Sequence, residues 1–139
     1  MPTGKRDRTR DQTVVVDSLI TRATATSDAT AGARTYTAAE VLGGIIVRDC
    51  AGAGRSDVLP TAALLVAAMD RPRIGDVVRC YIVNGSDAAE TLTIGAGTGG
   101  AFDTNQTATS RVIPQNSSKD VYIRLTGVVS GSEAYVVYM

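Results

Sequence analysis

Three glycines in the stretch TLTIGAGTGGAF, residues 91–102, have the spacing of a dinucleotide-binding loop. Gly95, Gly97 and Gly100 follow a short β-type run, and in such a loop glycines let the backbone approach a pyrophosphate. That chemistry also needs a helix that begins inside the motif, because its first N–H groups bind the phosphates. Residues 101–114 are rich in β-branched residues and lack a helical apolar repeat. We therefore predict a long flexible connection between two strands, where glycine allows positive φ and close backbone approach. Such a loop could equally line a symmetry axis between subunits, where only glycine leaves room.

The remaining side chains offer little catalytic or metal-binding chemistry. The chain has no histidine, which removes the usual general base and leaves zinc almost without ligands. Cys50 and Cys80 form no CxxC pair, and we expect buried free thiols in preference to a disulfide. Asp49, Asp57 and Asp70 flank a predicted helix and could form the carboxylate pair of a hydrolase, although acids at element ends are common as caps. We expect no enzymatic activity, no cofactor and no metal.

Arginine and tyrosine side chains alternate in two β-type runs. Arg79 and Tyr81 share one face of the first run, and Tyr122 and Arg124 share one face of the second. These residues would form the surface of a carbohydrate- or receptor-binding β-sandwich on a fibre or cell surface, which is the alternative function. We nevertheless interpret the five tyrosines as packing residues with one polar tip: Tyr36, Tyr81, Tyr122, Tyr135 and Tyr138.

The overall composition excludes several classes of protein. The 139 residues include 14 basic and 14 acidic side chains, so the chain lacks the basic excess of a dedicated nucleic-acid-binding protein. No apolar run approaches the roughly 20 residues that span a bilayer, and the charged N-terminus precedes no secretion-signal core. We expect synthesis in a cytoplasm and no membrane contact. With no Trp and one Phe, the core must be built mostly from small side chains, and such a core gains from subunit contacts.

The sequence divides into an extended N-terminal arm, residues 1–34, and a β-rich body, residues 35–139. The arm joins a charged stretch, a short apolar run and a Thr/Ala-rich stretch without periodicity. At the start of the body, the capping-box spacing of a Thr and a Glu predicts a helix over residues 38–43. The run TAALLVAAM, which lies between two prolines, predicts a second helix over residues 61–69.

From residue 74 onward, short β-type runs alternate with turn residues. One face of each run is apolar and the other is mixed, which is typical of antiparallel strands. The predicted fold is therefore mainly β: a compact antiparallel β-sandwich or barrel with two short helices and an extended arm. The final run, EAYVVYM, would lie in the middle of a sheet or beneath a neighbouring subunit, because an open apolar edge invites pairing.

The order of these parts resembles small accessory structural proteins of tailed-phage virions, in particular capsid decoration, or cement, proteins. The resemblance covers about residues 35–139 and rests on the layout and on segments such as GGIIVRD, LPTA and VNGS. It implies a homotrimer on the outside of the head, made in the host cytoplasm, that stabilises the shell. The implied partners are the major capsid protein and further copies of the chain, with no direct nucleic-acid contact.

The arm has the properties that such an attachment needs. Its apolar run can add as a strand to a sheet edge on the shell, and its basic residues can bind an acidic surface in a salt-sensitive way. The predicted attachment residues are Lys5, Arg6, Arg8, Arg10, Val14, Val15, Val16, Leu19 and Ile20. The predicted subunit-interface residues are Gly95, Gly97, Gly100, Phe102, Tyr135 and Tyr138. Deletion of residues 1–34 is expected to leave a folded oligomer that no longer binds heads.

Overall fold

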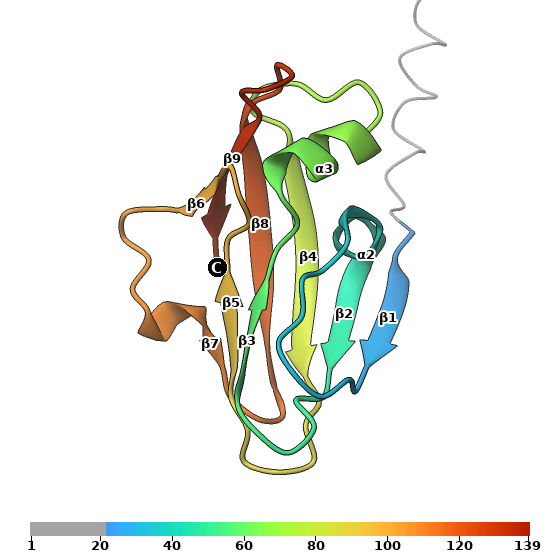
Figure 1. The fold of residues 1–139 in the computed structure, drawn as a ribbon, viewed down its shortest axis with the longest axis vertical. Helices are drawn as coiled ribbons and strands as arrows, with labels where there is room; N and C mark the ends of the chain where they lie inside the picture. The colour runs from blue at the N-terminus through green and yellow to red at the C-terminus, as the bar shows by residue number, and fades with distance from the viewer. Residues whose placement is uncertain (1–21) are drawn as a thin grey trace, which may run out of the picture.

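The computed structural model describes residues 22–139, which form two open sheets and two short α-helices (Figure 1). The larger sheet contains, in spatial order, β1 (Thr24–Asp28), β2 (Gly44–Arg48), β4 (Val77–Asn84), β8 (Ser117–Gly127), β9 (Ala134–Tyr138) and β6 (Gly100–Phe102). The smaller sheet contains β3 (Arg55–Val58), β5 (Leu92–Gly95) and β7 (Val112–Ile113). Neither sheet closes on itself, so the mainly β prediction is confirmed as a sandwich and not as a barrel.

The two helices form where the sequence predicts them. Helix α2 covers Ala38–Gly43, and α3 covers Ala62–Ala68, one residue shorter at each end than expected. The capping box is present: Glu40 N–H donates to Thr37 Oγ1 at 3.2 Å, and Thr37 N–H donates to Glu40 Oε2 at 2.8 Å. A short 3₁₀ turn, η2 (Thr109–Arg111), precedes β7. Within residues 22–139, no helix has the length and apolar character to cross a membrane.

Strand pairing is mixed, and the expected antiparallel pairing is found in only part of each sheet. The pairs β1–β2, β2–β4, β3–β5 and β6–β9 are parallel, whereas β4–β8, β8–β9 and β5–β7 are antiparallel. The alternation of apolar and mixed positions reports only that one face of a strand is buried. It does not report strand direction, because any strand with one uncovered face alternates in the same way.

The body begins before the boundary that we predicted at residue 35. Strand β1 pairs with β2 from Thr24 opposite Gly44 to Asp28 opposite Arg48. Arg34 then joins this segment to α2, with ion pairs of 2.6 Å to Asp28 and 2.9 Å to Glu40. Deletion of residues 1–34 would therefore remove an edge strand as well as the arm. The mostly exposed burial pattern of β1 explains why its sequence shows no apolar period. The apolar run at 14–20 lies outside the described residues.

A single apolar core fills the space between the sheets. Its members come from both sheets and both helices and include Val41, Ile46, Leu65, Ile82, Leu92, Ile94, Ile113, Val121 and Ile123. Cys50 and Cys80 are free and buried, which confirms the predicted thiols. Burial, with a smaller contribution from the charge of Glu40, raises the pKa of Cys80 to about 12. Its thiol is therefore a packing group and not a nucleophile at neutral pH.

Candidate functional site

The glycine loop connects two strands and serves packing within the chain. Gly95 is the last residue of β5 and Gly100 is the first of β6, so a strand follows the motif where a dinucleotide site needs a helix. A Cβ on Gly97 would lie 2.5 Å from the carbonyl oxygens of residues 59 and 60. A Cβ on Gly100 would lie 2.2 Å from the ring of Tyr135. The predicted close backbone approach between two strands is confirmed, but the connection is short and comprises only residues 96–99.

Tyr135 packs the glycine loop against the rest of the chain. Its burial removes two residues, Gly97 and Tyr135, from the subunit interface that we predicted. The ring is 1% exposed, its hydroxyl donates to Pro60 O at 2.9 Å, and Gly97 N–H donates to the hydroxyl at 2.8 Å. Burial raises its pKa. Gly97 and Tyr135 therefore belong to the interior of one chain, because their polar groups and packing partners are internal. Phe102 is partly buried, with the Arg111 guanidinium 4.4 Å from its ring centre.

A buried charge cluster joins the two sheets. Arg48 on β2 and Asp57 on β3 are both fully buried, and Arg48 Nε donates to Asp57 Oδ2 at 2.7 Å. Tyr36 OH donates to the same oxygen at 2.8 Å, and Arg34 N–H donates to Asp57 Oδ1 at 2.8 Å. Burial, and then the charge of Asp57, raise the pKa of Tyr36. We therefore interpret the cluster as structural, because both carboxylate oxygens of Asp57 already accept hydrogen bonds within the chain.

The three acids of the hydrolase hypothesis serve different structural purposes. Asp57 is the counter-ion of Arg48, so it is not the free carboxylate that a paired-acid mechanism needs. Asp49 lies instead beside Asp87 and Glu90. Asp70 is exposed in the turn after α3. The geometry therefore gives no support to a site built from Asp49, Asp57 and Asp70.

One face of the larger sheet is left uncovered by the rest of residues 22–139, and we name it the outer sheet face. Strand alternation directs Cys80 and Ile82 into the core and Arg79 and Tyr81 outward. Register then places Arg79 opposite Tyr122, which in turn lies opposite Tyr138. The outer sheet face comprises Ile45, Val47, Val77, Arg79, Tyr81, Val83, Asp120, Tyr122, Arg124, Val136 and Tyr138.

Polar contacts fix the centre of the outer sheet face. Arg79 Nε donates to Asp120 Oδ1 at 2.9 Å, and its guanidinium lies 5.7 Å from the ring centre of Tyr122. The hydrogen bond and the charge of Asp120 raise the pKa of Arg79. Tyr81 and Ser118 are joined through their hydroxyls. These contacts hold two aromatic rings in place on the surface, which reduces the entropy lost when a partner binds.

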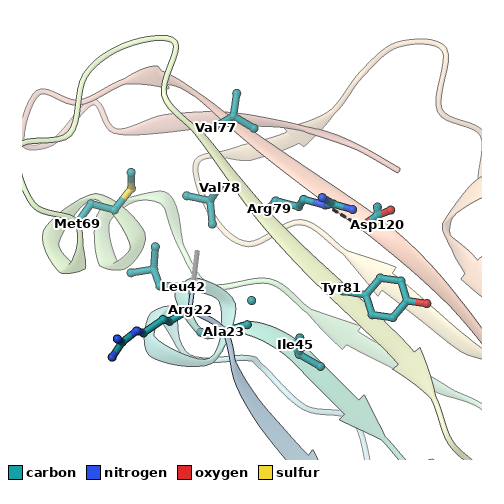
Figure 2. Close-up of a pocket in the computed structure, with 12 residues that line it drawn as sticks. Arg22, Ala23, Leu42, Ile45, Met69, Val77, Val78, Arg79, Tyr81 and Asp120 are labelled. Carbon is teal, nitrogen blue, oxygen red and sulfur yellow. Dashed lines mark hydrogen bonds and ion pairs between the residues drawn. The ribbon is translucent and has the colours of Figure 1, made fainter. Parts of the chain in front are cut away.

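A groove of about 690 Å³ adjoins this face. Figure 2 shows Leu42 of α2 and Met69 at the end of α3 on one side, with Val77 and Tyr81 of β4 on the other. Arg22, the first described residue, also lines the groove. The described part of the chain therefore begins at this groove, beside the outer sheet face.

The tyrosine prediction holds for two of the five residues. Tyr36 and Tyr135 are buried packing residues, whereas Tyr81, Tyr122 and Tyr138 are 37–40% exposed on the outer sheet face. The alternation of Arg and Tyr in the sequence was the signal for this surface, since it placed both residue types on one face.

A scan against protein-family models, a search of curated proteins and a search of solved structures found no match to this chain.

Proposed function

We propose that this protein is a non-enzymatic capsid decoration protein that associates with itself and binds the outside of a phage head. The observation that carries the binding role is the outer sheet face, where Tyr81, Tyr122 and Tyr138 lie exposed beside Arg79 and Arg124. Tyr and Arg are the residue types that protein interfaces favour, and an uncovered apolar and aromatic face marks a docking surface.

The charges on the outer sheet face favour a second copy of the chain as its binding partner. Arg79 lies beside Asp120 and Arg124 lies further along the same strand as Asp120, so the same surface presents both signs of charge around its tyrosines. A surface with both signs of charge can meet oppositely charged groups on a second copy of the chain, and in a ring such as a trimer these groups lie on a different patch of the neighbour. The resemblance to decoration proteins adds the expectation that the oligomer is a trimer.

In this proposal, residues 1–21 attach the protein to the shell. All of the predicted attachment residues, from Lys5 to Ile20, precede the first described residue, Arg22. Three such segments in one trimer would bind cooperatively through effective concentration, which gains about 10²–10⁴-fold over a single segment. The head and its major capsid protein are the proposed partners, and the virion exterior is the proposed location.

Self-association is tested by replacing the two central tyrosines. The double substitution Tyr81→Ala and Tyr122→Ala is expected to weaken self-association by at least about 30-fold, because buried interface tyrosines contribute roughly 2 kcal/mol or more. Sedimentation over a concentration series measures the change. The matched control is Leu64→Ala with Val129→Ala, which removes apolar side chains of 60% and 68% exposure away from the face and should leave association unchanged. A wild-type protein that stays monomeric at every concentration contradicts the proposal.

Head binding is tested by deleting residues 1–21 and not 1–34. The shorter deletion keeps β1 and the Arg34 ion pairs, so the truncated protein should unfold at the wild-type temperature and form the same oligomer. It is expected to lose co-sedimentation with purified heads. Alanine at Lys5, Arg6, Arg8 and Arg10 should weaken binding and reduce its salt dependence, whereas alanine at the exposed Arg71 and Arg73 should not. Full occupancy of heads by the truncated protein would contradict this role for residues 1–21.

A carbohydrate- or receptor-binding role is the second candidate. The observation in its favour is the Arg79–Asp120 ion pair beside Tyr81 and Tyr122, which combines hydrogen-bonding groups with exposed aromatic rings. Glycan binding by a monomeric wild-type protein, lost in the Tyr81→Ala and Tyr122→Ala variant, would favour this role over self-association.

A further inference from the structure

Three carboxylates meet at one end of the sandwich. Asp49 follows β2, and Asp87 and Glu90 lie in the connection between β4 and β5. One oxygen from each of the three side chains lies within 4.8 Å of the other two. Three like charges this close repel one another strongly unless a cation or a proton is shared among them.

Glu90 is the unusual member of this cluster. Its side chain belongs to a residue that is 5% exposed, and both of its carboxylate oxygens are shielded from solvent without a hydrogen-bond partner among residues 22–139. Asp57, the other buried acid among residues 22–139, accepts hydrogen bonds from three donors. A buried, unpaired carboxylate carries a large desolvation cost. The pocket around Glu90 therefore lacks the positive group that the Asp57 pocket contains.

The two arginines nearest to the cluster in the sequence, Arg48 and Arg55, donate their hydrogen bonds to groups other than these three carboxylates. Arg48 donates to Asp57 and to the carbonyls of residues 30, 32 and 49. Arg55 donates to the carbonyls of residues 50 and 51. Asp49 accepts one hydrogen bond, from Ala51 N–H at 2.9 Å, which leaves its remaining lone pairs available.

Buried polar contacts fix the two loops that carry the acids. Asn84 Nδ2 donates to Glu90 O at 2.8 Å and to Ile113 O at 2.9 Å. Cys50 N–H, next to Asp49, donates to Ser86 Oγ at 2.9 Å, and Ser86, next to Asp87, donates through that oxygen to Asn84 Oδ1 at 2.7 Å. One buried network thus sets the positions of all three acids, which is how ion-binding residues are held in place.

We propose that Asp49, Asp87 and Glu90 bind a divalent cation, with Ca²⁺ as the preferred ion. The ligands are all oxygens, and Ca²⁺ takes six to eight oxygens at about 2.3–2.6 Å, so ligand atoms on opposite sides of it are about 5 Å apart. The 4.8 Å limit on the oxygen separations fits one such ion. Asp87 is exposed, so water can complete the coordination from that side. The bound ion would join the β2–β3 turn to the β4–β5 loop.

The test uses the full chain, freed of metal with EDTA and returned to buffer with CaCl₂, MgCl₂ or chelator. Calorimetric titration with CaCl₂ is expected to show binding near one ion per chain, and saturating Ca²⁺ should raise the Tm by at least about 5 °C. Mg²⁺ should raise it less, because it demands a tighter octahedral site. The exposed Asp70 supplies the control variant, Asp70→Asn, which should keep the full Ca²⁺ response.

Substitution of Glu90 separates ion binding from a general effect on folding. In EDTA, Glu90→Gln is expected to unfold at or above the wild-type temperature, because a neutral amide removes the unpaired charge. In Ca²⁺ the order should reverse, since the variant lacks a ligand, and Asp87→Asn should also lose the response. Absence of Ca²⁺ binding in the wild-type protein would overturn the proposal. A Ca²⁺-dependent rise in Tm that survives both substitutions would also overturn it.

Discussion

Replacement of Asp57 by alanine is expected to lower the free energy of unfolding by about 3–5 kcal/mol, because it leaves a buried guanidinium without a counter-ion. Arg48 and Asp57 have no exposed side-chain surface, and they are joined at 2.7 Å. The substitution also removes the acceptors of Tyr36 OH and Arg34 N–H. Urea denaturation followed by circular dichroism measures the loss, and it should appear as a lower midpoint.

An exposed ion pair on the same protein provides the control. Arg79 and Asp120 are joined at 2.9 Å, yet their side chains are 64% and 36% exposed, so Asp120→Ala should cost less than about 1 kcal/mol. The double variant Arg48→Met with Asp57→Leu should recover only part of the loss of Asp57→Ala, because it removes both charges but leaves Tyr36 OH, Arg34 N–H and the carbonyls of residues 30, 32 and 49 without these partners. If Asp57→Ala costs no more than Asp120→Ala, the ion pair does not hold the two sheets together.

Features that depend on neighbouring residues in the chain were predictable from the sequence. The capping box of Thr37 and Glu40 positions α2 through contacts three residues apart. The alternation of Arg79 and Tyr81 with buried residues placed both on the outer sheet face, because a strand reverses its side chains at each residue. Local periodicity therefore found the helices and the surface that we propose as the interaction site.

Features that depend on contacts between distant segments were not predictable in the same way. Strand direction is set by crossovers such as the one from β2 to β4 through the other sheet, and no periodicity records it. Strand β1 buries little surface, so its sequence carries no core pattern. Asp49 and Glu90 are 41 positions apart and meet only after folding, which is why the acidic cluster had no signal in the sequence.

Gly97→Ala is expected to destabilise the fold by about 3 kcal/mol or more, at the upper end of the cost of overpacking. The added Cβ would lie 2.5 Å from the carbonyl oxygens of Leu59 and Pro60, and backbone atoms cannot rotate away as a flexible side chain can. Any shift of the loop would also disturb the hydrogen bonds of Tyr135 with Gly97 N–H and Pro60 O. Thermal and urea unfolding measure the loss.

Gly95→Ala is the matched control, because it changes the first glycine of the same motif. Its Cβ would meet Val58 at 3.5 Å and Asp57 O at 3.6 Å, which are ordinary contacts, so the expected change is within about 0.5 kcal/mol. A dinucleotide site would give the opposite pattern: both variants would fold normally and lose nucleotide binding. Equal stability of Gly97→Ala and Gly95→Ala would mean that the motif is not held by the close approach to residues 59 and 60. A large difference between them would assign the glycine spacing to the packing of the β5–β6 loop, because only that packing distinguishes the two positions.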